Sequence, residues 1–287
     1  MGDDDRQTYR RRRIGDALRA FRDDLGLTQG AAGRLLDRSQ ASLSAYENGH
    51  RAIRPRDLKH ILDMYGVTDE LLRTRLLSLA AQGRQDGWWH DFNERLEPGA
   101  VDFVSLEADT CSIRTFDAQL IPGLFQSEAY ARAVISGSGT ALRRSPQEIE
   151  TDVSFRMRRQ RIHTRCDPPK IAVVLGEAAL RQRTGGRDVM RGQLAKLLAM
   201  GSLPHIELQV LPFDVETNPG VDGAFVIMGL EPDGILEVVT LHSMTRTWYV
   251  DEPSDVEHYV STFEWLRELA LPEPETLTLI DRISSET

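Results

Sequence analysis

The stretch from Thr28 to Gly49, TQGAAGRLLDRSQASLSAYENG, restricts the possible folds of this chain more than any other. Its hydroxyl residues Thr28 and Ser39 stand where helix N-caps are expected, and they predict helices over Gln29–Leu36 and Gln40–Asn48. Gly49 is expected to end the second helix. The stretch therefore predicts two short helices joined by a tight turn.

The second of these helices has two unlike faces. Leu43 and Tyr46 fall on one side and predict a packed face. The opposite side carries small or amide side chains, namely Gln40, Ala41, Ser44 and Ala45. Such a helix fits the major groove of double-stranded DNA, where residues near the helix N-terminus approach base edges and glutamine can pair with adenine. We therefore expect this stretch to bind DNA.

Five motifs mark the stretch: Thr28-Gln29, Leu35-Leu36, Ser39-Gln40, Leu43-Ser44 and Tyr46-Glu47-Asn48-Gly49. In these residues the chain resembles the helix-turn-helix of the phage-repressor class, the xenobiotic-response-element (XRE) type of transcriptional regulator. The resemblance implies base-reading positions at Gln40, Ala41 and Ala45. It places four further side chains near DNA phosphates, namely Gln29, Ser39, Ser42 and Asn48. It also implies an ion pair between Arg22 and Glu47, on the first and third helices.

The chain departs from that family at four positions. Where the family prefers leucine, alanine, glycine and an apolar residue, this chain has Ala32, Gly33, Asp37 and Arg38. Gly33, like Gly30, should cost about 1 kcal/mol relative to alanine inside a helix. Asp37 is expected to take the left-handed turn conformation. Arg38 puts a charge where the family buries a side chain, so we expect it to extend outward toward the DNA backbone.

Basic residues flank the two helices. Arg10–Arg13 form either an arm that lies along phosphates or in the minor groove, or a solvated tail that balances Asp3–Asp5. After Gly49, Arg51 and Arg56 lie beside the DNA-reading helix. The resemblance assigns a contact with the DNA backbone or minor groove to Arg56. We include both arginines in the predicted interface.

Apolar residues at helical spacing predict three further helices. The buried stripe of the first is expected to be Ile14, Leu18, Phe21 and Leu25, and the apolar face of the fourth is Leu58, Ile61, Leu62 and Tyr65. The fifth carries more apolar surface than a small domain needs, so part of it is expected to pack against the second domain or another subunit; its apolar residues are Leu71, Leu72, Leu76, Leu77 and Leu79. These patterns predict an all-α, five-helix, repressor-like domain over residues 1–82. A linker with the paired Trp88 and Trp89 is expected over residues 83–100.

Residues 101–287 alternate between strand and helix patterns, which predicts an α+β or α/β domain. Expected strands are Ser112–Phe116, Ile171–Leu175, Ile206–Leu211, Ala224–Gly229, Leu236–His242 and Arg246–Val250. Ser127 is expected to cap a helix. Ser145 with Glu148 and Ser254 with Glu257 have capping-box spacing, and the helix that starts at Ser145 is expected to extend toward Thr164.

Further motifs run along this second half: Ser105-Leu106-Glu107-Ala108, Ser112-Ile113-Arg114, Pro122-Gly123-Leu124-Phe125-Gln126, Tyr130-Ala131-Arg132, Arg158-Arg159-Gln160, Glu177-Ala178-Ala179-Leu180, Gln193-Leu194, Val210-Leu211-Pro212-Phe213 and Ala224-Phe225. In them the chain resembles a C-terminal domain of unknown function that follows this helix-turn-helix in many actinobacterial regulators. The resemblance implies a transcriptional regulator with a small partner protein encoded nearby. Relatives often carry an acidic residue where this chain has Val238-Val239-Thr240, so a site that needs that acid is not expected here.

Five arginines lie between residues 156 and 165, namely Arg156, Arg158, Arg159, Arg161 and Arg165. They form either a second surface for nucleic acid or a solvated face with internal ion pairs. The acidic excess of the second half favours the solvated face. His163, His205 and His242 lie far apart in sequence and are expected to be ordinary surface or core histidines.

The net charge of −9 is divided unevenly along the chain. The first 75 residues hold 15 basic and 12 acidic residues, which leaves 20 basic and 32 acidic residues for the rest. An acidic second half would suppress indiscriminate DNA association and leave binding to the N-terminal domain. No apolar run is long enough to span a bilayer, and the charged N-terminus does not resemble a secretion signal, so we expect a cytoplasmic protein.

The sequence carries no strong catalytic or metal-binding motif. We find no phosphate-binding glycine loop with a following lysine, no zinc spacing and no glycine-flanked nucleophilic serine. Cys111 and Cys166, the only cysteines, are expected to be buried thiols. We therefore expect no catalytic residue, no metal and no cofactor.

Two functions follow from these patterns. In the first, the chain is a non-enzymatic regulator that binds a palindromic operator as a homodimer, and its C-terminal domain dimerises, senses a small-molecule effector or receives a protein partner. In the alternative, the C-terminal domain is a DNA-targeted enzyme that acts on a nucleotide-type substrate. A pocket with convergent acidic and basic side chains favours the enzyme, whereas a mostly apolar cavity favours sensing.

Overall fold

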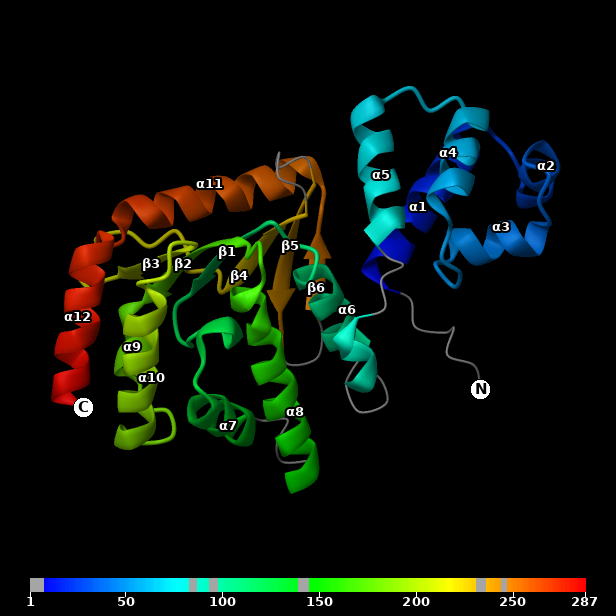
Figure 1. The fold of residues 1–287 in the computed structure, drawn as a ribbon. Coiled ribbons are helices and arrows are strands. Elements are labelled where there is room, and N and C mark those ends of the chain that lie inside the picture. Colours follow the sequence, from blue (N-terminus) through cyan, green and yellow to red (C-terminus); the bar gives the residue numbers. More distant parts are fainter. Residues whose placement is uncertain (1–7, 83–86, 93–97, 139–144, 231–235, 244–246) are drawn as a thin grey trace. The chain divides into compact units, whose positions relative to one another are not determined.

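The computed structural model describes residues 8–82, 87–92, 98–138, 145–230, 236–243 and 247–287 (Figure 1). The chain divides into two compact units, Met1–His90 and Asp91–Thr287. Part of the predicted linker, together with Asp3–Asp5, lies outside the described residues. No described helix is both long and apolar enough to cross a bilayer.

The first unit consists of the five predicted helices: α1 (Tyr9–Asp24), α2 (Gln29–Leu35), α3 (Gln40–Glu47), α4 (Pro55–Met64) and α5 (Glu70–Gln82). The predicted caps are confirmed. Thr28 Oγ1 accepts a hydrogen bond from the Ala31 amide at 3.2 Å, and Ser39 Oγ accepts one from the Ser42 amide at 3.2 Å. Each cap satisfies a backbone donor that the first helical turn leaves free.

Most residues of the predicted apolar faces form the core of this unit, but Leu25 at the end of α1 and Leu71 on α5 are exposed. Ile14, Leu18, Leu43, Tyr46, Leu58, Ile61, Leu62, Tyr65, Leu76 and Leu79 are all buried. Leu25 was expected at the end of the first buried stripe, but it is 48% exposed because α1 ends before it. Gly15 lets α1 approach α3 closely, since a Cβ there would lie 2.6 Å from the Glu47 carbonyl oxygen.

Arg10–Arg13 do not form an arm or a tail. Thr8 caps α1 by accepting a hydrogen bond from the Arg11 amide at 3.3 Å, so all four arginines lie within the first turns of the helix. Arg10 is buried at 4% exposure, and Arg12 is exposed. The run is therefore neither an extended DNA-binding arm nor a solvated tail, and both interpretations were wrong.

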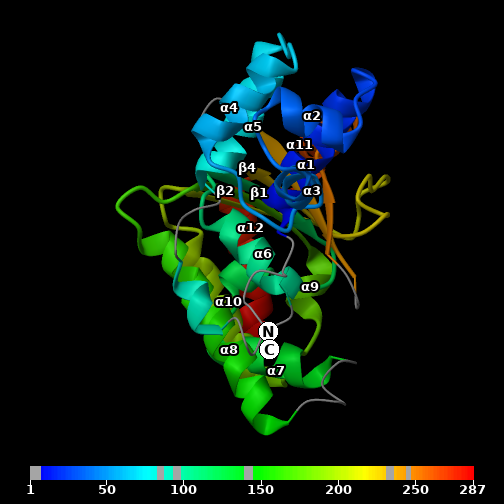
Figure 2. The same ribbon diagram turned by 90° about the vertical axis from the view of Figure 1, so that its right-hand side faces the viewer.

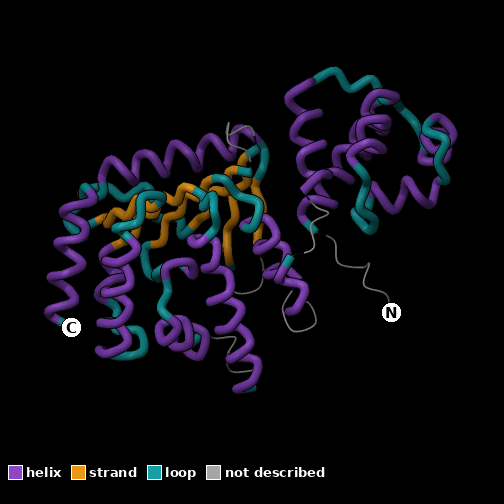
Figure 3. The backbone as a smooth tube through the Cα atoms, in the orientation of Figure 1, coloured by secondary structure: helices purple, strands orange, loops and turns teal. Residues whose placement is uncertain are grey.

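The second unit is built on a six-stranded mixed sheet (Figure 3). Its strands are β1 (Ser112–Asp117), β2 (Lys170–Gly176), β3 (Ile206–Leu211), β4 (Phe225–Gly229), β5 (Glu237–His242) and β6 (Thr247–Val250). The order is β3-β2-β1-β4-β5-β6. β1, β2 and β3 are parallel, whereas β4, β5 and β6 pair antiparallel with their neighbours. All six predicted strands are confirmed to within two residues at each end, and the fold is α+β.

Helices cover both faces of this sheet, as Figure 1 shows, and Figure 2 gives the same ribbon from the side. On one face, α11 (Pro253–Leu269) packs Phe263 and Leu266 against Phe116, Val174 and Val239. On the other, α7 (Glu128–Gly137), α10 (Arg187–Met200) and α12 (Glu273–Glu286) pack over an apolar cluster from β1, β2 and β3. α6 (Pro98–Glu107), α9 (Glu177–Arg181) and the short η2 helix (Gly123–Phe125) complete this second side.

Helix boundaries in this unit follow the predicted caps, except at α11. Ser145 and Glu148 form a reciprocal capping box at the start of α8 (Pro146–Arg159). The chain then continues to Thr164 as the η4 helix (Gln160–Thr164), which is a 3-10 turn. Ser254 was expected to cap α11, but the helix begins one residue earlier at Pro253, whose fixed φ suits a first helical position. Cys111 and Cys166 are both exposed, so their predicted burial is also wrong.

Candidate nucleic-acid interface and cavity

Helix α3 has the two-faced character expected of a recognition helix. Leu43 and Tyr46 are buried in the first unit, at 1% and 6% exposure. Gln40 and Ala41 are exposed, and Ala45 on the same side is partly exposed. The first turn of the helix therefore presents an amide and a methyl group outward, as contact with base edges in a groove requires.

Glu47 connects three helices at the end of α3. Its carboxylate accepts hydrogen bonds from Arg22 Nε at 2.7 Å, Arg22 Nη2 at 3.1 Å and Gln29 Nε2 at 2.9 Å. Glu47 is 1% exposed, and its hydrogen bond raises the pKa of Arg22 above the ordinary value. The ion pair implied by the resemblance is confirmed. Because three donors from α1 and α2 share one carboxylate, the orientation of α3 is fixed relative to both helices.

The predicted interface divides into exposed and partly buried side chains. Ser39, Gln40, Ala41, Arg38, Arg51 and Arg56 are exposed, whereas Gln29, Ser42, Ser44, Ala45 and Asn48 are partly buried. Gln29 Nε2 binds Glu47, and Asn48 Nδ2 donates to Ser44 Oγ at 3.1 Å. Gln29 thus links α2 to α3, whereas the bond between Asn48 and Ser44 lies within the end of α3. These bonds limit the groups that the three side chains can offer to phosphates.

Arg19 is a residue that sequence reasoning missed. Its Nη2 donates to Asn48 Oδ1 at 2.5 Å and to the Glu47 carbonyl oxygen at 3.3 Å. Arg19 therefore satisfies acceptors at the C-terminal end of α3. The available signal was its position one turn before Arg22, because residues three apart on α1 share a face.

The turn between α2 and α3 explains two unusual residues. Asp37 has a φ of 51°, so the predicted left-handed conformation is confirmed. A Cβ on Gly33 would lie 2.8 Å from the Arg38 carbonyl oxygen. The glycine lowers helix propensity in α2, but the tight turn requires it.

Arg38 extends outward, as predicted, and pairs with α4. Its Nη2 lies 2.8 Å from Asp57 Oδ1. The ion pair holds the Arg38 guanidinium at the first turn of α4, which also carries the exposed Arg56.

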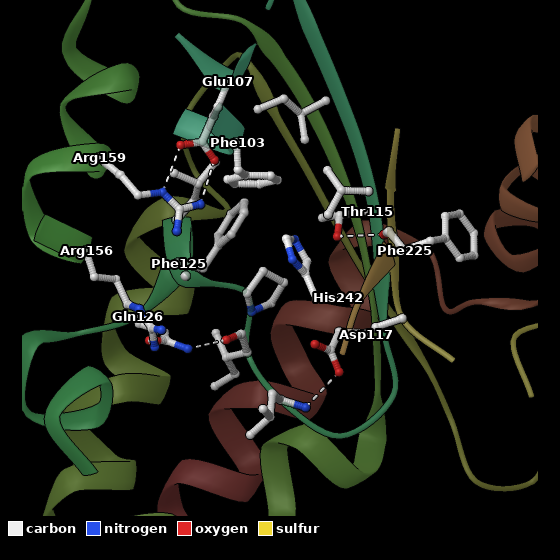
Figure 4. A pocket seen from close by; sticks show the side chains of 18 of the residues that line it. Phe103, Glu107, Thr115, Asp117, Phe125, Gln126, Arg156, Arg159, Phe225 and His242 are labelled. Carbon is white, nitrogen blue, oxygen red and sulfur yellow. Dashed lines mark hydrogen bonds and ion pairs between the residues drawn. The ribbon is translucent and has the colours of Figure 1, made fainter. Parts of the chain in front are cut away.

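The second unit contains a cavity of about 930 Å³, shown in Figure 4. Its walls come from α6, β1, η2, α8, β4 and the ends of β5 and β6. Five phenylalanine rings line it: Phe103, Phe116, Phe125, Phe155 and Phe225. The volume lies in the range of sites that bind small organic molecules.

Glu107 and Arg159 form a closed ion pair in one wall of the cavity. Arg159 Nε lies 2.9 Å from Glu107 Oε2, and Arg159 Nη2 lies 2.7 Å from Glu107 Oε1. The guanidinium also lies 5.0 Å from the centre of the Phe103 ring. Both carboxylate oxygens are thus satisfied, and the two charges cancel.

Arg156, one helical turn before Arg159, faces the cavity with a neutral partner. Its Nη1 donates to Gln126 Oε1 at 2.9 Å (Figure 4). Among the residues that the structure describes, no carboxylate lies within 4.0 Å of its guanidinium. Burial, and secondly the charge of Arg159, lower the pKa of Arg156 to about 10. Arg156 is still a cation at neutral pH.

Asp117 and His242 are the other titratable groups at the cavity. Asp117 Oδ1 accepts hydrogen bonds from the Gln119 and Leu120 amides at 3.0 and 2.9 Å, while burial raises its pKa. The His242 ring lies 4.9 Å from that of Phe103. Its side chain is accessible from the cavity, but surrounding protein and then Arg159 disfavour the imidazolium and lower its pKa to about 4. His242 is neutral at pH 7.

The arginine-rich segment is therefore not simply a solvated face. Arg158 and Arg159 do form ion pairs, but their partners Asp91 and Glu107 lie outside the segment; Arg158 Nη1 is 2.8 Å from Asp91 Oδ2. Arg156 and Arg159 nevertheless line the cavity. Two of the three histidines, His163 and His205, lie close together although they are far apart in sequence, with ring centres 5.8 Å apart.

Comparison with known protein families also divides the chain into an N-terminal and a C-terminal part. A family described as a helix-turn-helix domain matches residues 13–76, and one described as a domain of unknown function, DUF5753, matches residues 100–282. No curated protein and no solved structure matches the chain. The order inferred from the motifs, a helix-turn-helix followed by a domain of unknown function, is confirmed.

Proposed function

This chain belongs to the DUF5753 family, and on that premise we propose that it is a sequence-specific DNA-binding transcriptional regulator of the XRE type, active in the cytoplasm. The observation that carries this proposal is the exposed first turn of α3 on a helix that the buried Glu47 network holds in place. A rigid helix with a free glutamine near its N-terminus is suited to reading base edges.

We assign base contacts to Gln40, Ala41 and Ala45. Gln40 can form two hydrogen bonds with adenine, and the two alanines allow close approach and contact with a thymine methyl group. Ser39, the N-cap of α3, and Ser42 in its first turn are assigned to nearby phosphates, and Ser44 to the edge of the base contact. These assignments rest on the exposure of the first turn of α3.

We assign phosphate contacts to Arg38, Arg51 and Arg56, with Gln29 and Asn48 as partly engaged neighbours. The three arginines are exposed around the helix-turn-helix. Phosphate contacts of this kind set the position of the protein on the duplex and make its affinity depend on salt.

We further propose that the regulator acts as a homodimer on a palindromic operator. One recognition helix contacts only a few base pairs, and two half-sites on one face of the duplex raise affinity and specificity together. The second unit would then dimerise, receive a small partner protein or bind a ligand that alters DNA binding.

The cavity offers some support to an enzyme acting on a nucleotide-type substrate, because acidic and basic side chains converge there. Their environments favour binding over catalysis. The Glu107 carboxylate is paired with Arg159, and Asp117 accepts hydrogen bonds from backbone amides. His242, with a pKa near 4, is a weak base at neutral pH.

Selection of bound sequences from a random double-stranded library tests the proposed function. The full chain should enrich two inverted half-sites whose centres lie about 10 base pairs apart, or a multiple of that spacing. Enrichment of a single unpaired half-site would contradict the homodimer. A lack of enrichment at low salt would contradict sequence-specific binding itself.

A further inference from the structure

We propose that the cavity of the second unit binds a small organic anion, whose carboxylate or phosphate group pairs with Arg156 and whose apolar body lies among the phenylalanine rings. The inference deepens the proposed ligand control of DNA binding, and it rests on that proposed function only for its regulatory consequence.

The charge of Arg156 is the first support. Arg158 and Arg159 each have a carboxylate partner, Asp91 and Glu107 respectively. Within the described part of the chain, Arg156 has only the neutral amide oxygen of Gln126. A partly buried cation without a counter-charge is unfavourable, and a ligand anion removes that cost on binding.

The orientation of Arg156 is the second support. Gln126 is buried, and its Nε2 donates to the Ile121 carbonyl oxygen at 2.6 Å. This bond turns Gln126 Oε1 toward Arg156 Nη1, which anchors one edge of the guanidinium. The remaining N–H donors of the planar group can then bind two oxygens of one anion in parallel.

The carboxylates at the cavity already have other partners, which leaves Arg156 to bind one anionic group of a ligand. Glu107 faces Arg159, and Asp117 faces the Gln119 and Leu120 amides, so neither carboxylate is directed at Arg156 by a contact. His242 is neutral at pH 7. The cavity therefore offers one unpaired cation and calls for a ligand with one negative group.

The shape and composition of the cavity set the rest of the ligand. Five phenylalanine rings and a volume of about 930 Å³ fit an aromatic or aliphatic body of drug-like size. Aromatic walls favour flat ring systems through offset or edge-to-face contact. The ligand class is thus an amphipathic organic acid.

Two fluorescent probes that differ by one charged group test this directly. Anilinonaphthalene sulfonate carries an anionic sulfonate on an aromatic body, and phenylnaphthylamine is its uncharged counterpart. With the full chain, the sulfonate probe should bind one per chain and more tightly than the uncharged one. In Arg156→Met, affinity for the sulfonate probe should fall about tenfold or more, whereas affinity for phenylnaphthylamine should stay nearly constant.

Three further variants make the result decisive. Arg161→Met removes an exposed arginine from the adjacent turn and should leave both affinities unchanged. Arg156→Lys should retain part of the preference for the sulfonate probe. Ala224→Trp, at the exposed rim of the cavity, should weaken both probes. Equal losses for the two probes in Arg156→Met, or an equal loss in Arg161→Met, would overturn the proposal.

DNA binding by the same preparations separates this proposal from the proposed function. Arg156→Met should still bind the selected operator. If probe binding fails while operator binding persists, the cavity assignment is wrong and the regulator stands. If operator binding fails while Arg156 still distinguishes the two probes, the proposed function is wrong and the anion site stands.

Discussion

The Glu47 network allows a quantitative test of how the first unit is held together. In Glu47→Ala, Arg22 Nε, Arg22 Nη2 and Gln29 Nε2 lose the acceptor that they share at 2.7, 3.1 and 2.9 Å. Removing one partner of a buried ion pair costs about 3–5 kcal/mol. Arg22 Nη1 keeps its bond to the Leu27 carbonyl oxygen at 2.8 Å and its contact with Asp23. We therefore expect a loss near the lower limit, about 3 kcal/mol.

A loss of that size is a large fraction of the free energy of unfolding of a small domain, which is about 5–15 kcal/mol. Hydrogen exchange in the full chain measures it within the first unit alone. Amides of α1, α2 and α3 should exchange about a hundredfold faster in Glu47→Ala, as 3 kcal/mol implies when exchange follows local opening. Amides of the sheet should be unaffected.

Two comparison variants sharpen this test. Glu70 lies on α5 and is exposed, so Glu70→Ala should change exchange little. The double variant Arg22→Met with Glu47→Leu replaces both charges by apolar groups and should recover part of the stability. Unchanged exchange in Glu47→Ala, or a double variant less stable than Glu47→Ala, would refute the reasoning.

Three other outcomes are expected. Gln40→Ala should cost about 1–3 kcal/mol at one base position and relax the preference there, which competition with operator variants measures. Arg56→Ala should weaken binding to all sequences alike and lower the slope of log affinity against log salt by about one unit; a change in base preference would contradict its assignment. The His242 ring should titrate near pH 4 by NMR, below the ordinary 6.5, so its contribution to stability is fully present above pH 6.5 and is lost as the pH falls from 6.5 toward 4; a midpoint near 6.5 would contradict the lowered pKa.

Local signals in the sequence were sufficient for most of the fold. The caps Thr28, Ser39 and Ser145 each act within three residues of themselves, so sequence spacing alone reveals them. The run in β2 is continuously apolar because that strand is covered on both faces. The cap predicted at Ser254 failed because Pro253 competes locally for the start of α11.

The parts that sequence reasoning missed depend on contacts between distant segments. Arg19 reaches Asn48, 29 positions further along the chain, and Arg159 reaches back 52 positions to Glu107. The arginine-rich segment looked like a solvated face because its pattern does not show which turn of α8 points at the sheet. The cavity likewise forms only when α6, α8 and the ends of β5 and β6 come together.

Protection of guanine N7 in the selected operator is the most direct test of the central claim, that the exposed edge of α3 lies in the major groove. Dimethyl sulfate methylates this atom from the major groove. With the full chain at low salt, guanines in both half-sites should be protected, and Gln40→Ala should lose affinity at one position of each half-site. Bound DNA with every guanine N7 still reactive, or no binding to the operator at all, would contradict the account.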